Sequence, residues 1–101
     1  MFLKNYINGK LVSPVSGEYL DNVNPATGKV YAHIPDSDER DVQQAVEAAA
    51  GTFPAWSSCG IQERSRILTK IADLIEQNLE KLAQAETADS GKAITTSRSV
   101  D

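Results

Sequence analysis

The sequence predicts an α/β fold in which short antiparallel strands come first and two or three α-helices follow. An Asn-Gly pair between two β-prone runs near residue 8 indicates a hairpin. Residues 29–34 alternate between apolar and polar, as a half-buried strand does. Farther along, apolar residues recur at helical spacing without an intervening Pro or Gly. We therefore expect strands within about residues 5–34 and helices at about 37–52 and 61–90.

The amino-terminal third is expected to be short antiparallel β-structure. Asn8-Gly9 suits a tight turn, because both central positions of such a turn need a positive φ angle. A second turn is expected from Asn24 to Gly28, where Pro25 fixes φ and Gly28 permits a left-handed conformation. Hairpins of this size are marginal alone, so a covering layer must stabilise them.

The first helix is expected to begin just after Asp36 or Ser37, since either side chain can accept hydrogen bonds from the free amides of the first turn. Pro54 is expected to end this helix because proline lacks the amide donor. The apolar positions at helical spacing are Val42, Ala45, Val46 and Ala49.

The stretch from 61 to 90 is expected to be one long helix with a C-terminal cap at Gly91. Its large apolar residues fall on one face: Ile67, Leu68, Ile71, Leu74, Ile75, Leu79 and Leu82. The remaining residues are too few to cover so large an apolar face. Because residues 92–101 carry no stop signal, the sequence is expected to be a fragment of a longer chain.

Composition limits the class of protein. The net charge of −4 gives no basic surface for nucleic acid or an anionic membrane. No apolar run approaches the roughly 18 residues that span a bilayer, and the amino terminus lacks a secretory pattern. A single cysteine excludes an internal disulfide, so a cytoplasmic location is expected.

Two motifs that suggest phosphate binding or catalysis lack the partner residues that this chemistry requires. Gly91-Lys92 resembles the end of a phosphate-binding loop, but Glu86 stands where that loop needs glycine and a helix precedes it. Cys59 would need a base, and nothing in the sequence brings the single histidine, His33, to it. We therefore expect Cys59 to be a thiol in a linker and His33 to lie at the surface. A thiol-transfer protein using Cys59 remains an alternative that requires a fast-reacting thiolate.

Asp89 is a candidate cation ligand. It falls in the last turn of the long helix, where the helix dipole disfavours a carboxylate. A hard cation bound by Asp89 and nearby carbonyl oxygens would compensate. The alternative is an exposed carboxylate that water screens.

An ordered set of motifs resembles the amino-terminal segment of the aldehyde dehydrogenase superfamily. The set covers nearly the whole sequence: Tyr6 to Lys10, Val23 to Val30, Asp41 to Ala49, Phe53 to Trp56, Glu63 to Leu68, Ile71 to Glu76 and Glu86 to Lys92. No single motif is decisive, but their order and spacing are specific. The ending at 97–101 is similar to the branches that act on semialdehydes, with betaine-aldehyde enzymes as neighbours.

The resemblance implies an enzyme that oxidises an aldehyde or semialdehyde to the carboxylate with NAD or NADP. Residues 1–101 would be the amino-terminal fragment of its Rossmann-like NAD(P)-binding domain, within a homodimer or homotetramer. The family's catalytic Cys and Glu and its cofactor-binding residues match no position here, and Cys59 does not align with the nucleophile. The partners implied are the rest of the subunit and a small aldehyde, and the fragment alone is expected to be inactive.

The resemblance also implies a structural Na+ or K+ ion. In the family, backbone oxygens before the Asn-Pro turn and an Asp near the Gly-Lys pair often hold a monovalent cation. Those positions match Asn22, Val23 and Asp89 in this sequence.

A different function remains open. A stand-alone, non-catalytic α+β interaction module derived from the same fold would use the apolar helix face to bind a partner. The length of the parent reading frame separates the two hypotheses, because only the enzyme needs a downstream Cys and Glu.

Overall fold

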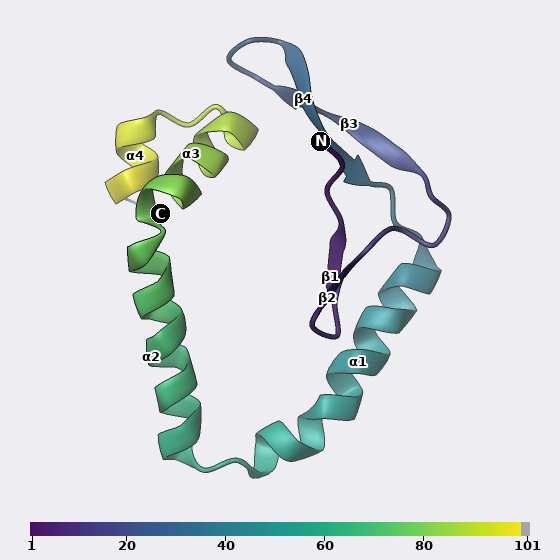
Figure 1. Ribbon diagram of the computed structural model, residues 1–101, viewed down its shortest axis with the longest axis vertical. Helices are drawn as coiled ribbons and strands as arrows, with labels where there is room; N and C mark the ends of the chain where they lie inside the picture. Colours follow the sequence, from purple (N-terminus) through teal and green to yellow (C-terminus); the bar gives the residue numbers. More distant parts are fainter. Residues whose placement is uncertain (100–101) are drawn as a thin grey trace. The chain divides into compact units, whose positions relative to one another are not determined.

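The computed structural model describes residues 1–99 and shows strands followed by helices, the expected order (Figure 1). The elements are β1 (Asn5–Ile7), β2 (Lys10–Val12), β3 (Tyr19–Asn24), β4 (Lys29–Pro35), α1 (Glu39–Ser58), α2 (Ile61–Gln77), α3 (Leu79–Ser90) and α4 (Ile94–Ser99). The strands form two antiparallel pairs, β1–β2 and β3–β4. The chain divides into two compact units: residues 1–23 with 30–58, and residues 24–29 with the chain from 59 onward.

The first hairpin confirms the Asn-Gly turn. β1 and β2 pair antiparallel with Ile7 opposite Lys10, so Asn8 and Gly9 alone connect them. Both turn residues have positive φ angles, 53° for Asn8 and 76° for Gly9. Two left-handed residues match the twist of the strands that they join. The turn chemistry in the sequence therefore sets this register.

The amino terminus adds a short parallel bridge to the second hairpin. The Leu3 amide donates to the His33 carbonyl and the His33 amide donates to the Met1 carbonyl, each at 2.8 Å. The Phe2 ring stacks on the His33 ring at a centroid distance of 4.5 Å and meets Tyr19 edge-on at 4.9 Å. This aromatic group fastens the first residues to β4.

The cap of α1 is Asp38, so the expected caps Asp36 and Ser37 are wrong. The Asp38 carboxylate accepts a hydrogen bond from the Arg40 amide at 2.9 Å, and the Asp41 carboxylate accepts one from the Asp38 amide at 3.0 Å. This reciprocal pattern resembles a capping box, with Asp41 in the role that Glu or Gln usually has.

Asp41 also ties α1 to the loop that follows β2. Its second carboxylate oxygen accepts a hydrogen bond from the Val15 amide at 2.9 Å. The residue is only 3% exposed, and such burial is rare for a carboxylate unless it is well partnered. Asp41 therefore serves the helix start and the loop at once.

The expected end of α1 near residue 52 is also wrong, because the helix continues through Pro54 to Ser58. Proline removes one amide donor to the preceding turn. One turn later, the hydroxyls of Ser57 and Ser58 both donate to the Pro54 carbonyl, at 3.1 and 2.8 Å. The helix bends in its last turns (Figure 1). A bend at proline with side-chain hydrogen bonds replaces the predicted stop.

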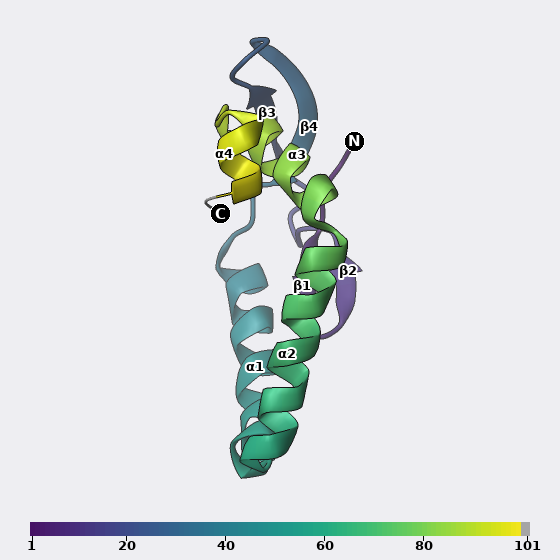
Figure 2. The same cartoon turned by 90° about the vertical axis from the view of Figure 1, so that its left-hand side faces the viewer.

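The long helix predicted for 61–90 is two helices that meet at Asn78. The Asn78 side-chain amide donates to the Leu74 carbonyl at 2.8 Å, in competition with the backbone. Asn78 has φ −112° and ψ 19°, which is not helical, and its carbonyl accepts the Leu82 amide at 3.0 Å. The same residue ends α2 and begins α3, and the chain changes direction there (Figure 2).

α3 and α4 pack side by side at the end of α2 (Figure 2). Ala83 and Ser97 are each 3% exposed, and the Ser97 hydroxyl lies 2.9 Å from the Thr87 hydroxyl. An Arg98–Glu80 ion pair joins the two helices at their surface. Within residues 24–29 and 59–99 of the second unit, Ala83 and Ser97 are the only buried residues.

Candidate functional site

An exposed apolar ridge lies on one side of α2 and the start of α3. We define the apolar ridge as Ile71, Leu74, Ile75, Leu79 and Leu82. These side chains are 45–50% exposed, and α2 contains no buried residue. With Asn78 and Lys81, four of them line an open groove of about 330 Å³. A contiguous exposed patch of this kind marks a surface that another polypeptide covers.

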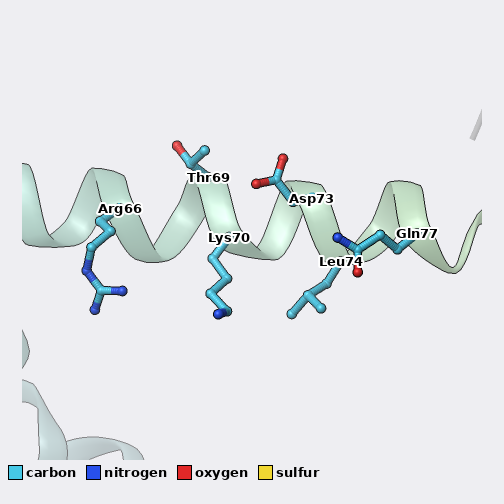
Figure 3. Close-up of a pocket in the computed structure, with 6 residues that line it drawn as sticks. All are labelled: Arg66, Thr69, Lys70, Asp73, Leu74 and Gln77. Atoms are coloured by element: carbon cyan, nitrogen blue, oxygen red, sulfur yellow. The ribbon is translucent and has the colours of Figure 1, made fainter.

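A neighbouring surface of α2 is polar and forms no enclosed site (Figure 3). A shallow hollow of about 460 Å³ there is lined by Arg66, Thr69, Lys70, Asp73, Leu74 and Gln77. Every lining residue comes from the same helix, so no second wall opposes them. Arg66 is already hydrogen-bonded to Glu63 at 3.0 Å and lowers the pKa of that carboxyl. We regard this surface as solvated.

The predicted cation ligands fall in both units of the chain. Asn22 and Val23 lie on β3, and Asp89 lies in the last turn of α3. The Asn22 side-chain amide donates to the Tyr31 hydroxyl at 3.0 Å. The ligands predicted at Asn22 and Val23 are their backbone oxygens. Within residues 1–99, no three His, Cys, Asp or Glu side chains gather as a metal-binding group. The monovalent site stays a prediction.

Cys59 and His33 also belong to different units. Cys59 is a half-buried free thiol in the short linker between α1 and α2, the position expected from the sequence. The His33 ring nitrogen Nδ1 lies 3.1 Å from an Asp21 carboxylate oxygen. The side chain of His33 is 32% exposed, as expected for a residue at the surface of a strand. Thiol transfer by Cys59 remains an untested alternative.

Sequence reasoning missed the close contact between Pro25 and the end of α3. Gly91 adopts the left-handed conformation expected of a helix cap, with φ 78°. A β-carbon on Gly91 would lie only 2.9 Å from Pro25 Cγ. The cap signal was visible in the sequence, but the partner lies 66 positions earlier and no local pattern points to it.

No helix within the described part of the chain is long and apolar enough to cross a membrane.

Comparison with known proteins gives one consistent result. The model of the aldehyde dehydrogenase family matches residues 11–101. Over its whole length the chain is 52% identical to 2-aminomuconic semialdehyde dehydrogenase from Bos taurus and covers 20% of that protein. It is 47% identical over 97 residues to acetaldehyde dehydrogenase from Pseudomonas aeruginosa, covering 96% of this chain and 19% of that one.

Solved structures agree with the sequence comparison. The crystal structure of PnpE in complex with nicotinamide adenine dinucleotide matches 99% of this chain and 20% of its own, with a TM-score of 0.94 and 42% identity. The NAD+ complex of aldehyde dehydrogenase from Bacillus cereus matches all of this chain and 21% of its own, with a TM-score of 0.94 and 37% identity. The chain thus spans about a fifth of the length of the relatives it matches. With the family model matched over most of its residues, this chain belongs to the aldehyde dehydrogenase family.

Proposed function

We propose that this chain acts as the amino-terminal segment of an NAD-dependent aldehyde dehydrogenase subunit. The complete enzyme would oxidise an aldehyde or semialdehyde to the carboxylate and pass the hydride to NAD. The segment would begin the Rossmann-like cofactor domain, and it would contribute structure to the enzyme without any catalytic or cofactor-binding side chain of its own.

The apolar ridge is the observation that carries this proposal. Five large side chains stay about half exposed on α2 and α3, although burying one such side chain fully is worth about 1.5–3 kcal/mol. The family members that this chain matches are about five times as long, because it covers 20% of them. In a subunit of that length, the other four fifths of the polypeptide would cover the ridge.

The relatives favour a particular cofactor and substrate class. Two of the matched structures are complexes with NAD, which favours NAD over NADP. The 52% identity to a 2-aminomuconic semialdehyde dehydrogenase favours a semialdehyde substrate. A homodimer or homotetramer is proposed for the complete enzyme on the basis of the family resemblance alone.

A chimera tests the proposal. This chain would replace the matching first fifth of the bovine semialdehyde dehydrogenase, and NADH formation would be followed at 340 nm with a semialdehyde substrate. We expect a soluble chimera with NAD-dependent activity. The same relative lacking its first fifth is the control and should be inactive. An insoluble or inactive chimera whose parent enzyme is active under the same conditions would contradict the proposal.

We also propose a monovalent cation held by the backbone oxygens of Asn22 and Val23 and by the Asp89 carboxylate. This part of the proposal rests on the family resemblance alone, in which oxygen ligands hold a monovalent ion. Crystals of the chimera soaked in a rubidium salt should give an anomalous signal beside Asp89. A dataset without that signal would remove the ion from the proposal.

A further inference from the structure

At the tip of the second hairpin, the Pro25 ring lies so near Gly91, at the end of α3, that no side chain fits between them. Residues 24–29 comprise the turn between β3 and β4 with one strand residue on each side, and they group with the second unit, which contains α2, α3 and α4. A β-carbon built on Gly91 would lie 2.9 Å from Cγ and 3.5 Å from Cβ of Pro25. Real β-carbons almost never approach a heavy atom to 2.9 Å. The Pro25 ring therefore occupies the space that a side chain at position 91 would need.

Pro25 is held rigidly on its side of the contact. The Asn24 side-chain oxygen accepts a hydrogen bond from the Ala26 amide at 2.9 Å. The Asn24 carbonyl accepts the Thr27 and Gly28 amides at 3.2 and 2.8 Å. Because proline also fixes its own φ angle, the turn presents the ring in one orientation.

Gly91 is held as firmly on the other side. Its amide donates to the Thr87 carbonyl at 3.0 Å and closes the last turn of α3. The next amide, that of Lys92, donates to the Ser90 hydroxyl at 3.2 Å. The Thr87–Ser97 hydroxyl pair then fixes α4 against α3. Neither partner can move away cheaply when a side chain is added at position 91.

We propose that Pro25 and Gly91 form a latch that fastens the hairpin tip, residues 24–29, to the end of α3. The latch depends on the absence of a side chain at position 91, because a single added carbon collides with the ring. It makes the tip a structural part of the second unit. When the latch opens, the peptide bond after Lys29 at the edge of the tip becomes available to a protease. This inference does not depend on the dehydrogenase activity.

The matched pair of variants is Gly91→Ala and Gly17→Ala, each made in the polypeptide that carries this chain at its natural length. Both glycines have a positive φ angle, 78° and 75°, so both variants carry the same backbone strain. Only Gly91 has a neighbour within 4 Å of the added carbon. We expect the rate of trypsin cleavage after Lys29 to be roughly tenfold higher in Gly91→Ala than in Gly17→Ala, which corresponds to about 1.4 kcal/mol. Equal rates would overturn the latch.

Removing the ring provides the second test. In Pro25→Ala the colliding Cγ is gone, so adding Gly91→Ala to it should raise the cleavage rate much less than Gly91→Ala does alone. Such non-additivity is the signature of two residues in contact. If Gly91→Ala does not fold, Pro25→Ala alone should still speed cleavage after Lys29 and leave cleavage after Lys10 unchanged. Additive effects, or an unchanged rate in Pro25→Ala, would refute the proposal whether or not the protein oxidises aldehydes.

Discussion

Glu80 and Arg98 form a two-pronged ion pair that joins α3 to α4. Arg98 Nε donates to Glu80 Oε2 at 2.8 Å, and Arg98 Nη2 donates to Glu80 Oε1 at 2.7 Å. The guanidinium matches the carboxylate geometrically, which makes this arrangement stronger than a single contact. The pair links positions 18 residues apart and holds the short α4 in place.

Acid should weaken the packing of α4 against α3. The hydrogen bonds from Arg98, with help from Gln84, lower the pKa of Glu80 to about 2 from an ordinary value of 4.5. Since the folded pKa is the lower one, the stabilisation is fully present above about pH 4.5 and is lost as the pH falls through about 2.

The variant Glu80→Gln tests that pH dependence. It should remove part of the loss of stability measured between pH 4.5 and 2 by circular dichroism in denaturant. Glu76→Gln is the control, because Glu76 forms no ion pair within residues 1–99. Identical acid profiles for wild type and Glu80→Gln would show that the pair contributes nothing in solution.

Leu74→Asp should be severe in the complete protein. The proposal places the 47%-exposed Leu74 under the rest of the subunit, where an uncompensated charge costs about 3–5 kcal/mol. Thr69→Asp is the matched control, since Thr69 points away from Leu74 on the same helix (Figure 3). Urea unfolding of the chimera should show a large loss for Leu74→Asp and a small one for Thr69→Asp. Equal small losses would mean that this face is not covered.

The chain expressed alone should associate with itself. The apolar ridge is then open to water, and contact between copies is the simplest way to bury it. We expect concentration-dependent sedimentation and binding of a hydrophobic dye, both reduced by Leu74→Asp. A sharp, two-state melt of a monomer would speak against this prediction.

Asp41→Ala should destabilise the first unit by about 1–3 kcal/mol, because two part-buried hydrogen bonds to a charged carboxylate are lost. The carboxylate accepts the Val15 and Asp38 amides, and both would lose their acceptor. Asp36→Ala is the control, because Asp36 is exposed and its effect should stay within about 0.5 kcal/mol. Equal melting temperatures for the two variants would show that the Asp41 carboxylate does not stabilise the start of α1 and the loop after β2.

Local signals in the sequence predicted much of the fold. Asn8-Gly9 predicted its hairpin because the turn chemistry lies within two residues. Gly91 predicted the end of α3 for the same reason. The errors came where side chains compete with the backbone. Asn78 divides a helix that the apolar period predicted as continuous. Pro54 lies inside a helix that continues to Ser58, where two serine hydroxyls donate to the Pro54 carbonyl.

Contacts between distant residues were beyond such reasoning. Asp41 entered the sequence analysis only as part of a family motif, although its buried carboxylate accepts a hydrogen bond from the amide of Val15. Pro25 was assigned to a turn, although its ring lies against Gly91. The exposed apolar ridge was predictable, because a stripe of large side chains at helical spacing needs a partner that these residues do not supply.

Hydrogen exchange in α2 tests the central claim most directly. The measurement compares amide exchange in residues 61–77 between the chain alone and the chimera that supplies the rest of the subunit. If the missing polypeptide covers the apolar ridge, exchange of these amides should slow by orders of magnitude in the chimera. Equally fast exchange in both proteins would contradict the account.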